Sequence, residues 1–123
     1  MKKKILIVDD AIFMRMCLKR ELEELNCDFL EAENGEVACE LFQKERPNLV
    51  VMDISMPVMD GIEALIVIRK MDLNVPVIIC SAMGQESMVI NAIKAGASDF
   101  ITKPFVHGRV LSSVRKLLAA QED

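Results

Sequence analysis

The stretch Ile5-Leu6-Ile7-Val8-Asp9-Asp10 (residues 5–10) joins a short apolar run to two neighbouring carboxylates. A second stretch, Leu49-Val50-Val51-Met52-Asp53 (residues 49–53), ends in one more carboxylate. Short continuous apolar runs are typical of strands that are buried on both faces of a parallel sheet. If these two strands are neighbours, their carboxyl ends lie at the same edge and the acids converge there. Because like charges in one pocket repel, the pattern predicts a site for a hard metal cation.

Outward from these two stretches, apolar runs alternate with helical periodicity along the whole chain. The expected strands cover residues 5–8, 28–31, 49–52, 75–80 and 99–102, and an amphipathic pattern follows each of them. Five strand–helix units predict one α/β domain over residues 1–123, with a five-stranded parallel sheet covered by helices on both faces and no effector domain. In such sheets the functional site lies beyond the carboxyl ends of the strands. The residues found there are Asp9, Asp10, Asp53, Ser81 and Lys103.

The composition excludes several classes of function. A chain of 123 residues with 52% hydrophobic and 28% charged residues can bury the core of one domain. Its net charge of -4 argues against a nonspecific nucleic-acid or anionic-membrane surface. No apolar stretch approaches the roughly 20 residues that span a bilayer, and no secretory signal is found, so we expect a cytoplasmic protein.

The thiols and the single imidazole offer little chemistry. Cys17, Cys27, Cys39 and Cys80 form no C-x-x-C pair and lie within apolar patterns, which favours reduced core thiols over disulfides or a zinc site. His107 is the only histidine and is expected at the surface, which disfavours histidine-based metal ligation or a Ser-His-Asp triad.

Together, the residues at the strand ends suit phosphoryl transfer. The Asp53 carboxylate can act as a nucleophile toward phosphorus, and Asp9 and Asp10 can hold Mg²⁺, which prefers oxygen ligands. The Ser81 hydroxyl and the Lys103 ammonium can bind phosphoryl oxygens. Taken singly, each residue has a simpler interpretation: Asp9 or Asp10 as a helix cap, and Lys103 as a solvated charge. Their joint arrangement favours a single site, because positioning and charge neutralisation are what phosphoryl transfer needs.

The pattern resembles the receiver domain of two-component response regulators, and within that family its single-domain chemotaxis subgroup. The matching stretches are Ile5 to Asp10, Met52-Asp53, Met56-Pro57, Met59-Asp60-Gly61, Ser81-Ala82, Lys94 to Gly96 and Lys103-Pro104-Phe105. The chemotaxis subgroup is indicated by Phe13 to Met16 and by Cys80 to Gln85. The resemblance implies a flavodoxin-like (βα)5 fold with strand order 2-1-3-4-5.

The resemblance also implies roles for individual residues. Asp53 would accept the phosphoryl group of a histidine kinase, and the domain itself would catalyse both its gain and its loss. Asp10 and Asp53 would be direct ligands of Mg²⁺ or Mn²⁺, with the backbone carbonyl of Ser55, while Asp9 would act through water. Ser81 and Lys103 would bind the phosphoryl oxygens.

Two further features of the site are implied in the same way. The Lys103-Pro104 peptide bond would be cis. Ser81 and Phe100 would form the switch: the Ser81 hydroxyl would move toward the phosphoryl group, and the Phe100 ring would then turn inward.

The implied partners are a CheA-like histidine kinase, a FliM-like flagellar motor switch protein and a phosphatase. The motor protein would contact the fourth helix, fifth strand and fifth helix of a monomer. A phosphorelay intermediate that passes phosphate to a histidine phosphotransfer protein is the alternative within the family.

Three other interpretations fit less well. A haloacid-dehalogenase-type phosphatase requires Asp-x-Asp after the first strand, but Ala11 takes the place of the second acid. A flavin module requires a phosphate loop and stacking rings, and the chain has no Trp or Tyr. A pseudo-receiver that serves only as a scaffold would have a damaged site, whereas this site is intact.

Overall fold

Strands and helices alternate along the chain, as the sequence predicts. The structure is a computed structural model that describes residues 2–121. Its strands are β1 (Lys4–Val8), β2 (Asp28–Ala32), β3 (Leu49–Asp53), β4 (Val77–Ser81) and β5 (Asp99–Thr102). Its helices are α1 (Ile12–Leu22), a short 3-10 turn (Glu23–Leu25), α2 (Gly35–Glu45), α3 (Gly61–Met71), α4 (Met88–Ala95) and α5 (Arg109–Ala119).

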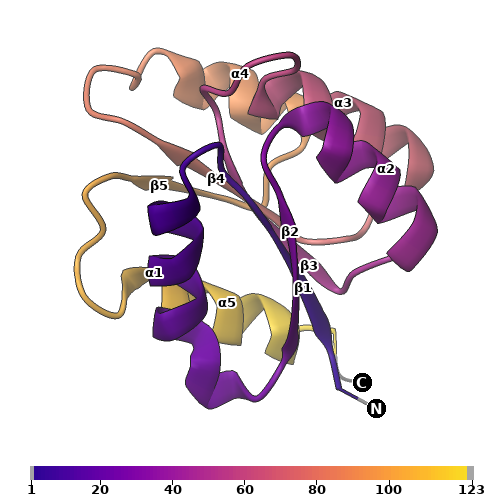
Figure 1. Ribbon diagram of the computed structural model, residues 1–123. Coiled ribbons are helices and arrows are strands. Elements are labelled where there is room, and N and C mark those ends of the chain that lie inside the picture. The colour runs from indigo at the N-terminus through magenta and orange to yellow at the C-terminus, as the bar shows by residue number, and fades with distance from the viewer. Residues whose placement is uncertain (1, 122–123) are drawn as a thin grey trace.

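The strands form one parallel sheet in the order β2-β1-β3-β4-β5 (Figure 1). Helices α1 and α5 cover one face, and α2, α3 and α4 cover the other (Figure 1). The strand order reverses between β1 and β3, which is where sheets of this class place their functional site. The predicted fold class and strand order are confirmed.

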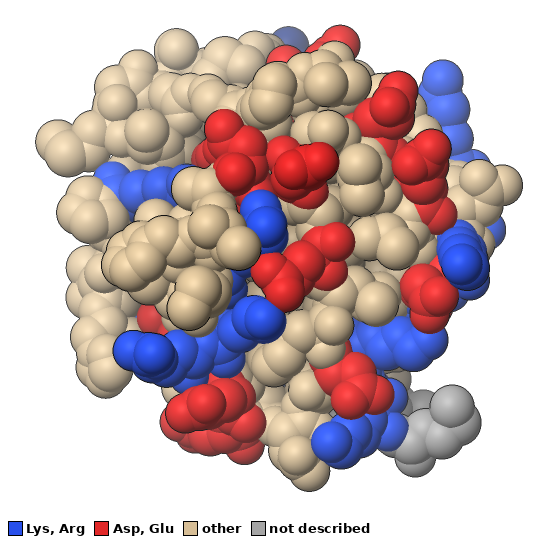
Figure 2. All heavy atoms as spheres, viewed as in Figure 1, with Lys and Arg blue, Asp and Glu red and all other residues tan. Residues whose placement is uncertain are grey.

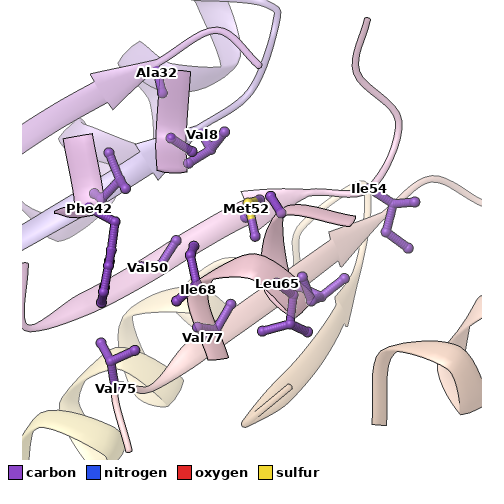
Figure 3. Packing of buried hydrophobic residues seen from close by; sticks show 14 of the residues in the cluster. Val8, Ala32, Phe42, Val50, Met52, Ile54, Leu65, Ile68, Val75 and Val77 are labelled. Carbon is purple, nitrogen blue, oxygen red and sulfur yellow. The ribbon is translucent and has the colours of Figure 1, made fainter. Parts of the chain in front are cut away.

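Each face of the sheet packs its own hydrophobic core. On one face, Phe42 of α2 and Leu65 and Ile68 of α3 pack on alternate residues of the strands, including Val50 and Met52 (Figure 3). On the other face, Leu18 of α1 and Val114 of α5 pack on the alternate strand residues, including Val51 and Ile78. The central strands are buried on both sides, which explains their unbroken apolar sequences.

The helices begin and end where local chemistry dictates. The Asn34 side chain caps α2 by accepting from the Val37 N–H, and Asp60 and Glu63 form a capping box at α3. Gly96 closes α4 with φ of 103°, as expected for a residue in the left-handed region.

Two expectations need correction. Strand β4 begins at Val77 and not at residue 75, because Pro76 has no N–H to give to the ladder. The prediction of four core thiols holds for Cys80 alone: Cys27 and Cys39 are half-buried, and Cys17 is exposed. All four are free thiols, and His107 is exposed as predicted.

Charged side chains of both signs lie on the surface of the molecule. Acidic and basic side chains are interspersed over the face shown in Figure 2, without an extended basic patch there. Within residues 2–121, no helix has the length and apolar character needed to cross a bilayer.

The register of the strands sets the position of the site. Val8 lies opposite Met52, so Asp9 and Asp53 follow at the same level of neighbouring strands. Ser81 lies opposite Thr102, so Lys103 also emerges at this edge of the sheet.

Candidate functional site

Three carboxylates meet at the carboxyl edge of the sheet. Asp9, Asp10 and Asp53 each offer an oxygen, and these oxygens lie within 4.8 Å of one another. Asp9 and Asp53 are only 2% and 8% exposed, whereas Asp10 faces solvent. The buried acids are held by local hydrogen bonds, since Asp9 accepts from the Ala11 N–H and Asp53 accepts from the Ile54 N–H.

One lysine lies against both buried carboxylates. Lys103 Nζ is 2.9 Å from Asp9 Oδ2 and 3.4 Å from Asp53 Oδ2. The peptide bond between Lys103 and Pro104, which turns the chain here, is cis. A single ammonium thus faces the buried carboxylates of two neighbouring strands.

The charges in the site alter its acid–base properties. Burial raises the pKa of Asp53; the Lys103 ammonium opposes this effect and the Asp9 carboxylate adds to it. Burial alone would lower the pKa of Lys103, but its contacts with Asp9 and Asp53 outweigh burial and raise that pKa. The ammonium is therefore held firmly protonated beside the acids.

The Ser81 hydroxyl stands out because it lacks a hydrogen-bond partner. Ser81 is 1% exposed, and its Oγ makes no hydrogen bond within the part of the chain that the structure describes. A buried, unsatisfied hydroxyl carries a free-energy penalty. At the end of β4, beside Asp53 on β3, it is available as a donor to a group that arrives at that carboxylate.

The donor set fits a hard divalent cation. Carboxylate oxygens are the ligands that Mg²⁺ and Mn²⁺ prefer, and the solvent-facing side of Asp10 leaves room for coordinating waters. The three acids and one lysine leave a net negative charge that such a cation would neutralise.

Other predicted residues lie at the rim of this site or away from it. Ser55 is exposed in the loop after β3, where its hydroxyl accepts from Gln85 Nε2 at 2.6 Å. The Phe100 ring is half-buried against the core beneath α2, α3 and α4. The structure thus places the acids, Ser81 and Lys103 at the carboxyl edge of the sheet, and Phe100 within β5 against the core.

Two contributions were not predicted from the sequence. A Cβ at Gly61 would overlap the backbone carbonyl oxygen of Asp53, so the start of α3 packs directly on the end of β3. The second is the Gln85 side chain, which joins two loops at the rim of the site. The Asp-Gly pair at residues 60–61 was the only sequence signal for the first, and no pattern signalled the second.

Comparisons with known proteins agree with this geometry. The family model of the response regulator receiver domain matches residues 5–115. The chain is 54% identical over 119 residues to the chemotaxis protein CheY of Bacillus subtilis, covering 96% of this chain and 99% of that one. It is 51% identical over 118 residues to the CheY of Thermotoga maritima, covering 95% and 98%.

A solved structure shows the same architecture. The receiver domain of the Francisella response regulator 1452 superposes with a TM-score of 0.89 at 32% identity, covering 98% of this chain and all of that one. The sequence match, the fold and the strand-end acids agree, and the chain belongs to the response regulator receiver domain family.

Proposed function

We propose that this protein is a phosphorylation-activated switch of a two-component system, and that Asp53 is its phosphoryl acceptor. One observation carries the proposal: Asp53 is a buried carboxylate that lies against Asp9, Asp10 and Lys103, one register position from the end of β4, where Ser81 has a hydroxyl without a partner among residues 2–121. It is a signalling switch and not a classical enzyme.

The proposed reaction is a phosphoryl transfer from a histidine kinase. An Asp53 carboxylate oxygen forms a bond to phosphorus while the phosphorus–nitrogen bond of the donor breaks, and the imidazole nitrogen leaves with the electron pair. Lys103 already lies 3.4 Å from Asp53, where its charge would neutralise a phosphoryl oxygen. Ser81 would donate its unused hydroxyl hydrogen to another oxygen.

A divalent cation, Mg²⁺ or Mn²⁺, would be held by Asp10, Asp53 and the backbone carbonyl of Ser55, with Asp9 acting through water. Bound there, it would neutralise the acids and the negative charge of the incoming group.

The proposed output is a protein contact made by α4, β5 and α5. Phosphorylation adds about -1.5 to -2 charge at one point. The Ser81 hydroxyl would move toward that charge, and the half-buried Phe100 would turn inward. Exposed apolar side chains on α4, Ile90 and Ile93, are each 62% exposed and would take part in the contact.

The partners follow from the relatives, which are named chemotaxis proteins. We propose a CheA-like kinase as the donor and a FliM-like motor switch protein as the target. Residues 1–123 would act as a single receiver unit whose output is this binding event.

The acceptor is tested by incubation with a small phosphodonor and Mg²⁺, followed by intact mass measurement. We expect one labile phosphoryl addition in the wild type and none in Asp53→Asn. Asp28→Asn, which changes an exposed aspartate on β2, is the matched control and should be modified like the wild type. An unmodified wild type, or equal modification of Asp53→Asn, would overturn the assignment.

The output is tested with an amino-terminal FliM peptide. We expect the phosphorylated protein to bind it more tightly than the unphosphorylated protein. Equal affinity, together with phosphoryl transfer to a histidine phosphotransfer protein, would favour a phosphorelay intermediate.

A further inference from the structure

The Gln85 side chain holds together two loops beside the proposed acceptor. Its Nε2 donates to Ser55 Oγ at 2.6 Å, in the loop after β3. Its Oε1 accepts from the Ala82 N–H at 2.8 Å, directly after β4. The Gln85 N–H also donates to the Ala82 carbonyl at 3.2 Å, so this one residue occupies both polar groups of Ala82.

The Ala82 N–H points toward the strand that carries the acceptor. In a strand, the N–H and C=O of one residue face the same neighbouring strand, and those of the next residue face the other neighbour. The Cys80 carbonyl accepts from Ile54 beside β3, and the Ser81 carbonyl accepts from Lys103 beside β5. The next residue is Ala82, so its N–H faces the β3 side again, at the level just beyond Asp53.

Two backbone donors on this side are already occupied. The Ile54 N–H is used by Asp53 itself, and the Ala82 N–H is used by Gln85. Gln85 also lines, with Asp10 and Ser55, a cleft of about 560 Å³ that opens beside the acids. A phosphoryl group on Asp53 would thus compete with Gln85 for the Ala82 N–H.

We propose that Gln85 is a positioning residue that latches the unphosphorylated state by occupying the Ala82 N–H. The inference rests on the proposed function of Asp53. A phosphoryl oxygen takes over the Ala82 N–H, Gln85 leaves both Ala82 and Ser55, and the loop between β4 and α4 is released. Gly84, at the tip of this loop, has φ of 91°, and the space where its side chain would lie is open.

The proposed latch role of Gln85 predicts an effect that a purely structural role of Gln85 does not. A side chain that stabilises both states equally leaves the affinity for a phosphoryl mimic unchanged. A latch that is lost on phosphorylation favours only the resting state, so its removal tightens binding of the mimic.

The test is a titration with beryllium fluoride and Mg²⁺, followed by amide NMR. The variant Gln85→Met keeps the length of the side chain and removes both hydrogen bonds. We expect its half-saturating concentration to be about fivefold to tenfold lower than that of the wild type, the effect of one to two net hydrogen bonds. Glu86→Gln is the matched control in the same loop and should stay within about twofold of the wild type.

A measurement on the wild type alone gives a second criterion. The Gln85 side-chain NH₂ signals should shift on saturation, because their contact with Ser55 is lost. Unchanged or weaker binding by Gln85→Met, or unmoved NH₂ signals in a saturated wild type, would overturn the latch while leaving the acceptor assignment intact. If the wild type itself does not bind the mimic, the proposed function fails, and the latch fails with it.

Discussion

Replacement of Lys103 by methionine would test what neutralises the acidic site. The Lys103 side chain is 19% exposed, and the carboxylate side chains it faces, Asp9 and Asp53, are 3% and 10% exposed. Methionine fills a similar volume but carries no charge. We therefore expect Lys103→Met to leave two buried carboxylates without a counter-charge in the absence of a divalent cation.

The size of the stability loss expected for Lys103→Met follows from this burial. Removal of one partner from a buried ion pair costs about 3–5 kcal/mol. We take the lower end, about 3 kcal/mol, because Asp10 opens the site to solvent. With a urea dependence of about 1–3 kcal/mol per molar, the unfolding midpoint should fall by about 1.5 M.

The assay is urea unfolding at pH 7 in EDTA, followed by circular dichroism because the chain has no Trp or Tyr. Lys44→Met, at an exposed position on α2, is the control and should unfold within about 0.5 kcal/mol of the wild type. Addition of Mg²⁺ should recover part of the loss in Lys103→Met, because a divalent cation neutralises the same carboxylates.

The stability loss caused by Lys103→Met should depend on pH in a definite direction. Burial already raises the folded-state pKa of Asp53, and without the Lys103 ammonium that opposes this effect the pKa rises further. The loss of stability is then greatest above the raised folded-state pKa, declines as the pH falls from that value to the unfolded pKa, and is absent below the unfolded pKa. A variant as stable as the wild type in EDTA at pH 7 would refute the view that Lys103 neutralises this cluster.

Three further predictions concern the surroundings of the site. Gly61→Ala should lower the free energy of unfolding by about 3 kcal/mol in the same urea assay, because its Cβ would overlap the Asp53 backbone; a loss under about 1 kcal/mol would contradict that packing. Burial would raise the pKa of Asp99, but hydrogen bonds from Ser113 and neighbouring groups outweigh burial and lower it. The resulting stability is present above the unfolded value and lost as the pH falls through the lowered one, so acid unfolding should begin at higher pH in Ser113→Ala. Ser81→Ala should unfold at the same urea concentration as the wild type or slightly higher, because it removes an unsatisfied buried hydroxyl, while phosphoryl uptake measured by intact mass should slow; a large loss of stability would reveal a hidden partner.

Much of the architecture could be predicted because parallel strands that are buried on both faces have short, continuous apolar sequences. Residues 5–8 and 49–52 lie in neighbouring strands as expected, and their shared register carries Asp9 and Asp53 to one edge. The same reasoning brought Lys103 to the acids from a distant part of the chain. Strand-end residues are predictable in this way because the parallel ladder fixes their level.

Other details depend on contacts that no short pattern encodes. Cys17 lies in an apolar pattern but on the outer face of α1, where the periodicity of that helix is weak. The bridge made by Gln85 depends on the conformation of two loops, and loop side chains follow no periodic rule. Among residues 2–121, the Ser81 hydroxyl lacks a hydrogen-bond partner because of the side chains and backbone that surround it in the folded chain, and a sequence pattern does not reveal these neighbours.

The placement of β5 at the margin of the sheet has a mechanical consequence. Asp53 belongs to β3, which is bonded to a strand on either side, whereas Lys103 follows β5, which is bonded to β4 alone. Displacing a border strand breaks one ladder of hydrogen bonds, and displacing an inner strand breaks two. The chemical event would therefore occur on a strand held by two ladders, and the response would spread to β5, which one ladder holds.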